Sequence, residues 1–289
     1  MRGRGPIAVC YVDGDAAWAA CLMTDLASHG LEVRDATGPD RAGVLASCGG
    51  VLVVHSWFAG YGRPTPAELA LVGARGCRIV VARRNAAKLS RDDYPGRTAA
   101  FALWPDYYQP DAAPARRVSG NGWTLALRGF GVEPAAVPKG YLFLSYRHDP
   151  DGPFVQERLR GALALDGYAT WSYRASQHIE DLDDAVLKRL EALVEAAAAM
   201  VVVTTSHWWS PWTEWELATA RKQDKPIVLV RPAGARTSRR NDLAGYPLEV
   251  LHTTDRKLPR TVAALRAAGV PPVLPPLHSG GSRRVVESL

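Results

Sequence analysis

Residues 200–230 read MVVVTTSHWWSPWTEWELATARKQDKPIVLV, and this stretch decides the fold. The β-branched run from Val201 to Thr205 predicts a buried parallel strand, because it has no polar face. Ser210 and Pro211 then mark a helix start, with the serine as N-cap and the proline at the first helical position. A second apolar strand, Ile227 to Val230, follows the helix. The stretch therefore predicts a strand–helix–strand unit of a parallel sheet.

The turn between this strand and this helix combines aromatic side chains with one carboxylate. Trp208, Trp209 and Trp212 lie in or beside the turn, and Glu216 lies four residues after Trp212, on the same face of the helix. Ligands of open α/β sheets bind at the carboxyl ends of the strands, which is where this group falls. We therefore expect a ligand site here. The alternative interpretation is a solvated helix carboxylate beside tryptophans that pack in the core.

The composition indicates a soluble, intracellular, globular protein. Of the 289 residues, 47% are hydrophobic and 22% are charged, with a formal net charge of +6. The basic residues are scattered or paired and no nucleic-acid motif accompanies them, so we expect solvated surface rather than a nucleic-acid or membrane interface. The four cysteines form no CxxC pair and predict reduced thiols of a cytoplasmic protein. We see no signal peptide and no apolar run near the roughly 20 residues of a membrane span.

Strands and helices alternate along both halves of the chain, which predicts the α/β class. Strands are expected at residues 7–12, 31–33, 51–54, 79–82, 141–146, 168–171, 201–205, 227–230 and 248–252. Helices are expected at residues 16–28, 41–47, 67–74, 154–165, 182–197 and 261–268, and after Ser210. We predict one domain at residues 6–134, a second at 139–272, and a tail or linker at 273–289.

Short matches between the halves predict an internal duplication. The distance from Glu68 to Glu216 is 148 residues, and so is the distance from Ile79 to Ile227, the starts of the strands that follow. Leu127-Arg128 near the end of the first half parallels Leu265-Arg266 near the end of the second. His29-Gly30-Leu31 parallels Asp166-Gly167-Tyr168. Three matches in the same order favour two domains of one fold.

The second half resembles the TIR (Toll/interleukin-1 receptor) domain family along most of its length. Phe143-Leu144-Ser145-Tyr146-Arg147 looks like the opening strand of that family. Gly167-Tyr168-Ala169-Thr170-Trp171 looks like its second strand, which leads into the BB loop. Ser210 to Leu217 resembles the S-x-W-x-x-x-E-L pattern of enzymatic TIR domains, in which the Glu is the catalytic residue of an NAD+-cleaving site.

The resemblance implies two flavodoxin-like TIR domains, each a mostly parallel five-stranded sheet flanked by helices. It implies Glu216 as catalytic residue and NAD+ as substrate rather than cofactor. The residues themselves predict no metal site, because the loop histidines His178 and His207 have no second ligand at metal spacing. One carboxylate suits this reaction, because the nicotinamide leaving group is already cationic and needs no general acid, while the carboxylate stabilises an oxocarbenium-like transition state. The residues expected to bind substrate lie at the strand ends and the turn: Ser145, Tyr146, Arg147, Trp171, Ser206, Trp208, Trp209 and Trp212.

The function implied is an NAD+ glycohydrolase or cyclase in immune, anti-phage or stress signalling. The implied partners are NAD+ and other TIR domains, by self-assembly or within one chain, since a neighbour's BB loop completes the site in many TIR enzymes. Two alternatives stay open. The protein could be a non-enzymatic adaptor that binds other TIR domains, or it could act like a nucleoside deoxyribosyltransferase, which shares the α/β fold and a glycosidic-bond Glu.

The sequence departs from the family pattern in two places. Residues 172–178 read SYRASQH, without the acidic residue and the glycine that often follow the second strand. The first half resembles TIR domains only in outline, because its opening strand reads Cys10-Tyr11-Val12-Asp13 and Pro64 stands four residues before Glu68 in place of a Trp. We therefore expect the first domain to be a degenerate, inactive copy.

Overall fold

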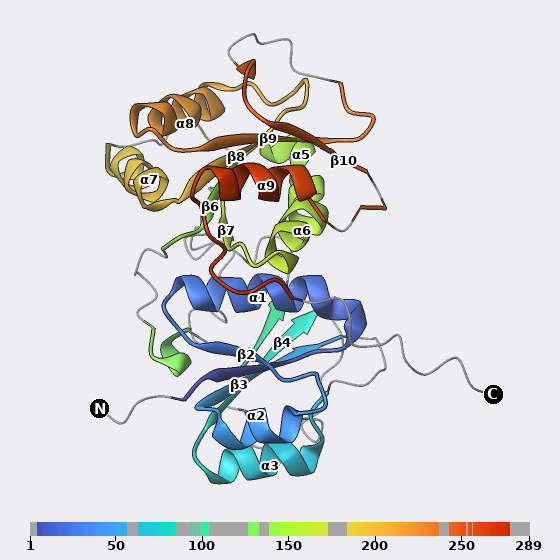
Figure 1. Cartoon of the computed structure of the whole chain (residues 1–289). Coiled ribbons are helices and arrows are strands. Elements are labelled where there is room, and N and C mark those ends of the chain that lie inside the picture. The colour runs from blue at the N-terminus through green and yellow to red at the C-terminus, as the bar shows by residue number, and fades with distance from the viewer. Residues whose placement is uncertain are drawn as a thin grey trace, which may run out of the picture.

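The computed structural model describes residues 5–56, 63–84, 94, 97, 99–103, 127–132, 139–172, 184–236, 243–252, 254–255 and 257–277. Each half of the chain forms a five-stranded sheet with helices on both faces (Figure 1). Neighbouring strands within both sheets are parallel. The α/β class, with parallel sheets flanked by helices, is confirmed. The loop after the second strand of the second half, predicted as a BB loop, lies outside the described residues.

The first sheet has the strand order β2-β1-β3-β4-β5. Its strands are β1 (Ile7–Cys10), β2 (Val33–Asp35), β3 (Gly50–His55), β4 (Arg78–Arg84) and β5 (Ala99–Leu103). Its helices are the 3-10 turn η1 (Asp13–Asp15), α1 (Ala16–Ser28), α2 (Arg41–Ser47) and α3 (Pro66–Ala74). Side chains of α1 pack on one face of the sheet, and those of α2 and α3 pack on the other.

The second sheet has the strand order β10-β9-β8-β6-β7. Its strands are β6 (Leu142–Ser145), β7 (Thr170–Trp171), β8 (Ala199–Val203), β9 (Ile227–Pro232) and β10 (Leu248–Leu251). Its helices are α5 (His148–Phe154), the π-helical turn η3 (Val155–Leu159), α6 (Arg160–Leu165), α7 (Asp184–Ala196), α8 (Pro211–Lys222) and α9 (Pro259–Ala267). Counted in chain order within each half, both sheets read 2-1-3-4-5, the order of flavodoxin-like folds.

The predicted elements agree with the structure best where the apolar pattern is strong. The helices α1 and α2 begin and end at the predicted residues, and α8 begins at Pro211 as expected. The strand β5 was not predicted. The helix expected at residues 154–165 begins earlier, at His148, and contains the π-helical turn. Its first turn, with Asp and Pro residues, gave no apolar helical period.

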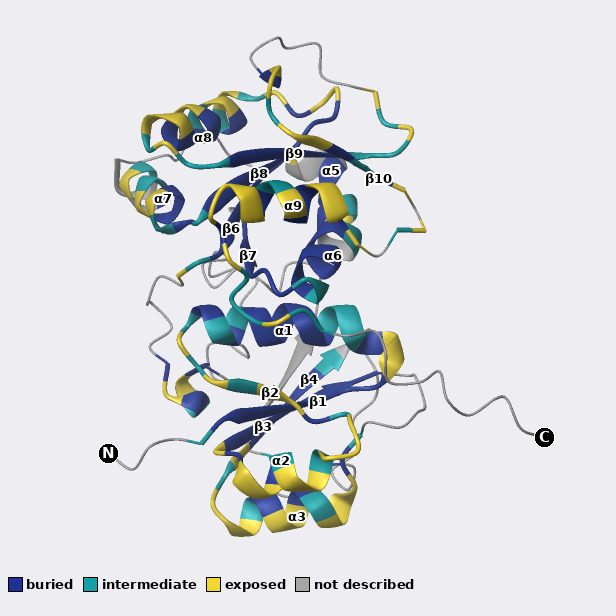
Figure 2. Ribbon diagram, in the orientation of Figure 1, coloured by how far each residue is buried: buried dark blue, intermediate teal, exposed yellow. Residues whose placement is uncertain are grey.

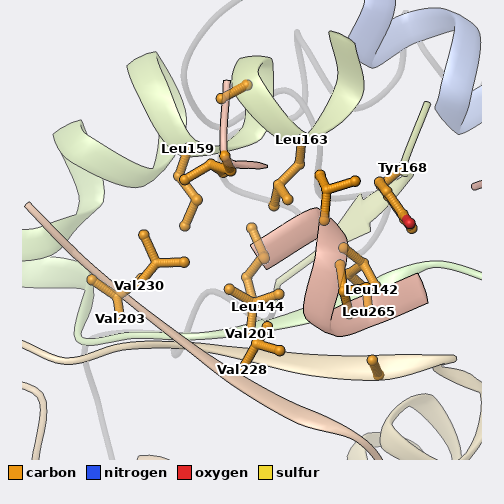
Figure 3. Packing of buried hydrophobic residues seen from close by; sticks show 14 of the residues in the cluster. Leu142, Leu144, Leu159, Leu163, Tyr168, Val201, Val203, Val228, Val230 and Leu265 are labelled. Carbon is orange, nitrogen blue, oxygen red and sulfur yellow. The ribbon is translucent and has the colours of Figure 1, made fainter. Parts of the chain in front are cut away.

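Buried apolar side chains fill both faces of each sheet (Figure 2). Against the second sheet, Leu159 and Leu163 from η3 and α6 pack over Leu144 and Val201, as Figure 3 shows. The opposite face of that sheet packs against α7 and α8 and contains Phe143 and Trp208. All four cysteines are free thiols. Within the described part of the chain, no helix is both long enough and apolar enough to cross a membrane.

The helix α1 lies between the two sheets and packs against α6 (Figure 1). A Cβ atom added to Gly161 would lie 3.0 Å from the Cβ of Ala17, so the two helices approach closely. Leu274 and Leu277 pack into the core around α1, and the Leu277 amide donates to the Leu165 carbonyl at 2.9 Å. Residues 273–277, which we predicted to begin a tail, therefore belong to the packed junction between the halves.

Candidate functional site

The start of α8 is held by a reciprocal pair of hydrogen bonds. The Ser210 hydroxyl accepts from the Thr213 amide at 3.2 Å, and the Thr213 hydroxyl accepts from the Ser210 amide at 2.9 Å. The Thr213 hydroxyl also donates to the Trp208 carbonyl at 2.8 Å. Such a capping box satisfies the free amides at the first turn of a helix. The turn and the helix are therefore one rigid unit, which fixes the position of Glu216 one turn further on.

Glu216 is a buried carboxyl group, not a solvated one. The residue is 6% exposed, and its Oε2 atom has no hydrogen-bond partner. Burial raises the pKa of Glu216 to about 8, and the nearby Ser145 hydroxyl opposes that rise. The Ser145 hydroxyl is near enough to affect this pKa, yet its geometry does not make a hydrogen bond. The group is thus mostly protonated at neutral pH while no ligand is bound.

Four buried polar atoms without partners lie on the α8 side of the second sheet. Ser145 lies two residues after Phe143 of β6, and Thr204 lies two residues after Val202 of β8. Side chains two residues apart in a strand share a face, so both hydroxyls point to the face that α8 covers. Buried polar groups in folded proteins are nearly always hydrogen-bonded, so a group of exceptions indicates a function. The four atoms are Ser145 Oγ, Thr204 Oγ1, Trp208 Nε1 and Glu216 Oε2.

These atoms lie where an open sheet of this order binds ligands. The strands β6 and β8 are neighbours, while the helices that follow them cover opposite faces of the sheet. The chain therefore leaves a crevice outside the carboxyl ends of these two strands. Ser145 ends β6, and Thr204 directly follows β8. The unpartnered hydroxyls and the carboxyl group of Glu216 are thus at the position in the fold that favours ligand binding.

A second buried carboxyl group, Asp151 on α5, lies on the opposite side of the same crevice and was missed from the sequence. The Thr205 hydroxyl donates to Asp151 Oδ2 at 2.9 Å and accepts from the His207 amide at 3.3 Å. Burial raises the pKa of Asp151, and Thr205, His207 and Arg147 oppose that rise. Its place on the helix after the first strand of a parallel sheet was the signal that could have identified it. Asp151 fixes the end of β8 beside the site.

The predicted aromatic residues take different positions. Trp208 is fully buried, whereas Trp209 is 48% exposed and donates from Nε1 to Glu214 Oε2 at 3.2 Å. Trp212 is partly buried against the same core as Trp208. Trp171 is nearly buried, with its ring centroid 5.3 Å from that of Phe143. Among these four tryptophans, Trp209 is the most exposed.

The other predicted residues divide between the two faces of the sheet and the surface. Tyr146 is buried on the α6 side, and its hydroxyl lies 3.5 Å from Ser172 Oγ. Arg147 and Ser206 are exposed. The structure therefore brings Ser145, Trp208, Trp212 and Glu216 to one face of the sheet and places Tyr146 on the other.

The strand registers identify which residues of the first sheet correspond to the candidate-site residues of the second sheet. Cys10 pairs with Val53 and Ser145 pairs with Val202, so His55, two residues after Val53, corresponds to Thr204. Cys10 itself corresponds to Ser145. Burial raises the pKa of the Cys10 thiol to about 12, and His55 Nδ1 lies 2.7 Å from the Tyr94 hydroxyl. The first sheet thus has a neutral thiol and a hydrogen-bonded imidazole at these places.

Glu68 corresponds to Glu216, since each stands seven residues before the residue that caps the end of its helix. Because α3 has 9 residues and α8 has 12, Glu68 falls in the first turn. There it accepts from the Thr65 amide and pairs with Arg41 at 3.0 Å. Burial acts to raise the pKa of Glu68, but the bonds from Thr65 and Arg41 outweigh it and leave the pKa below its usual value. Glu68 is therefore an ionised capping residue.

One apolar pocket of about 400 Å³ lies between α2 and α3, lined in part by Leu45, Leu71 and Val72. It opens beside Glu68 on the first sheet and so is separate from the crevice next to Glu216. Among the described residues, no three His, Cys, Asp or Glu side chains are grouped as a metal ion would require.

Comparison with known proteins finds a family match in the second half of the chain. Residues 142–269 match the family model described as TIR domain. No curated protein is significantly similar to the chain. Similar solved structures include a putative sugar-binding protein from Salmonella typhimurium LT2, at 12% identity and a TM-score of 0.27, covering 80% of this chain and 78% of that one. A putative two-component response regulator/GGDEF protein has 13% identity and a TM-score of 0.28, covering 92% of this chain and 100% of that one. Likenesses at this level support no inference.

Proposed function

We propose that the TIR domain at residues 142–269 cleaves the bond between nicotinamide and ribose in NAD+, as a glycohydrolase or a cyclase. The observation that supports the proposal most is the set of unpartnered buried groups around Glu216. A structural carboxyl group at that depth would be hydrogen-bonded or ion-paired. A ligand that brings hydroxyl groups, such as a ribose, would satisfy Ser145, Thr204 and Glu216 together.

The protonation of Glu216 suits a cationic substrate. Burial keeps most of this group protonated at pH 7, and no positive charge among the described residues contributes to lowering its pKa. The nicotinamide ring of NAD+ is cationic, and a positive charge within a few ångströms favours the ionised form of a carboxyl group. Binding of NAD+ would therefore drive off the proton and leave a carboxylate beside the ribose. That carboxylate then stabilises the positive charge that develops on the ribose in the transition state.

The aromatic residues of the turn have separate roles in this proposal. Trp209 presents an exposed ring whose orientation is fixed by Glu214, so it can stack on a base of NAD+. Trp208 supports the turn from beneath, as a buried residue. Arg147, exposed at the start of α5, can bind a diphosphate oxygen. We infer the signalling role, in immune, anti-phage or stress responses in the cytoplasm, from the enzymatic members of the family.

The first half is, in this proposal, a TIR-like copy that lost its chemistry. It has the strand order of the second half and the same strand registers. It also has the same hydroxyl-to-carboxylate bond across its crevice, from Ser56 to Asp15 at 2.5 Å, as Thr205 makes to Asp151. The residue at the place of the catalytic Glu, Glu68, is used to cap a helix and pairs with Arg41.

The direct test is release of nicotinamide from NAD+ by the purified full-length chain, measured at dilute and at concentrated protein. Glu216→Gln is expected to lower the rate by roughly 100- to 1000-fold, since it removes one preorganised transition-state contact. Glu68→Gln is the matched control, and we expect it to retain the wild-type rate. Equal, measurable rates for wild type and Glu216→Gln would show that Glu216 is not the catalytic residue. No nicotinamide release by wild type at any concentration would favour the adaptor. Release of a base from deoxynucleosides, but not from NAD+, would favour the transferase.

The pH dependence gives a second prediction. The catalytic form of Glu216 is the carboxylate, and its pKa in the empty site is about 8. Since kcat/KM reports the free enzyme, it should fall about tenfold per pH unit below pH 8 and level off above it. Initial rates at NAD+ concentrations well below KM, from pH 5.5 to 9, measure this directly. A flat profile from pH 6 to 8 would contradict the role of Glu216 that we propose.

A further inference from the structure

A buried arginine connects the helix at the junction to the second strand of the TIR domain. Arg160, the first residue of α6, is 1% exposed. Its Nε donates to the Thr170 hydroxyl at 3.1 Å, and its Nη2 donates to the Thr170 carbonyl at 3.3 Å. Thr170 is the first residue of β7. The guanidinium group is therefore bonded to both the side chain and the backbone at the beginning of this strand.

An acidic partner of this arginine comes from the other half of the chain. Asp25 lies on α1, and its Oδ2 is 4.0 Å from Arg160 Nη2. The side chain of Asp25 is 16% exposed, so the pair lies in the interior of the junction. Burial raises the pKa of Asp25 to about 7, and the Arg160 guanidinium opposes that rise. Removing one member of a buried ion pair is destabilising, because the other charge loses a partner that offset the cost of its burial.

The strand that Arg160 holds is short and lies at the edge of the sheet. The strand β7 has 2 residues, which pair with β6 at Leu142 and Phe143. A strand this short has few backbone hydrogen bonds of its own, so its position depends on the side chains that anchor it. Trp171 of β7 packs on Phe143, two residues before Ser145 of the candidate site. A shift of β7 would therefore reach the site through Phe143.

We propose that the first half of the chain positions the active site of the TIR domain, through the pair Asp25–Arg160 and the bonds from Arg160 to Thr170. In this arrangement Arg160 is a positioning residue of the second half, and Asp25 is contributed by the first. The TIR domain is incomplete without its neighbour on the same chain. The effect on catalysis rests on the function proposed above, whereas the effect on β7 does not.

The test uses the full-length chain and follows backbone amide hydrogen exchange at pH 8, where Asp25 is mostly ionised in the wild type. Asp25→Asn keeps the shape of the side chain and removes its charge. We expect the protection of amides in residues 168–172 to fall at least tenfold, while protection in β9 stays within twofold. Asp25→Glu should restore most of the protection. Glu32→Gln, which removes an exposed carboxylate paired with Arg34 in the same half, is the matched control and should change neither region.

Arg160→Met and the double variant Asp25→Asn/Arg160→Met test the coupling. Because both act on one pair, the double variant should lose no more protection in residues 168–172 than Arg160→Met alone. In the enzymatic assay, Asp25→Asn should lower kcat for nicotinamide release about tenfold with little change in KM. Unchanged protection in residues 168–172 in Asp25→Asn, or an equal loss in β9, would overturn the proposal. If the wild type releases no nicotinamide, the function proposed above fails, and the exchange data still decide whether Asp25 positions β7.

Discussion

The Glu216→Gln variant will be more stable than the wild type at pH 7, by roughly 3 kcal/mol. The pKa of Glu216 is raised from 4.5 to about 8 in the folded protein. Between these two values the folded state holds a proton that the unfolded state releases, so the stability of the wild type falls as the pH rises. The stabilisation that comes from the proton on Glu216 is fully present below pH 4.5 and is lost progressively as the pH rises to about 8. A glutamine has no such titration, so its pH curve is flat in this range.

Thermal unfolding of both proteins from pH 4.5 to 8.5 measures this difference. The two melting temperatures should be close at the acid end and separate by several degrees towards pH 8. Glu68→Gln is the matched control with the opposite sign, because the pKa of Glu68 is lowered in the folded state and its charge stabilises the protein. Parallel curves for wild type and Glu216→Gln would show that Glu216 does not titrate as its burial implies. A gain in stability with a loss of activity is typical of residues kept for function.

Replacement by alanine will have a much larger effect on stability at Trp208 than at the adjacent Trp209. Trp208→Ala should lower the free energy of unfolding by about 3–5 kcal/mol, because it removes a fully buried large side chain from the core. Trp209→Ala should change it by no more than about 0.5 kcal/mol, since that ring is 48% exposed. Urea denaturation followed by far-UV circular dichroism measures both variants.

The same pair of variants distinguishes a tryptophan that stabilises the core from one that binds NAD+. Trp209→Ala should raise KM for NAD+ while the fold stays intact, because the exposed ring is the one available for stacking. Trp208→Phe is the conservative control, and it should retain part of the stability that Trp208→Ala loses. If Trp209→Ala destabilises the chain as much as Trp208→Ala does, the exposed ring is instead part of the core.

The sequence predicts the buried strands and the start of α8 well, because their signals are local. Parallel strands buried on both faces read as apolar runs, and α8 begins with a serine and a proline whose roles at a helix start are local. The position of Glu216 follows from both, since it lies one turn into a helix whose start is fixed. That its carboxyl group is buried, with Oε2 unpartnered, does not follow, because this depends on how closely α8 packs on β6.

The residues missed from the sequence depend on contacts between distant segments. Asp151 meets Thr205 only because α5 and β8 are brought together by the sheet order. Arg160 looks like a solvated helix residue in the sequence, and its burial arises from α1 of the other half. The strand β5 follows residues with no clear period, so only its pairing with β4 identifies it. Non-local pairing of this kind leaves no signal in a short sequence window.

The π-helical turn η3 determines how the two halves of the chain can be aligned. The residue numbers of equivalent positions differ by 135 at Cys10 and Ser145, and by 136 at Asp15 and Asp151. They differ by 137 at Gly30 and Gly167, the two glycines with positive φ that follow α1 and α6. A π-turn holds one more residue than an α-turn, and η3 lies between the second and third of these pairs. An alignment of the two halves therefore needs a gap inside a continuous helix, and an ungapped one would compare every residue of α6 with the wrong residue of α1.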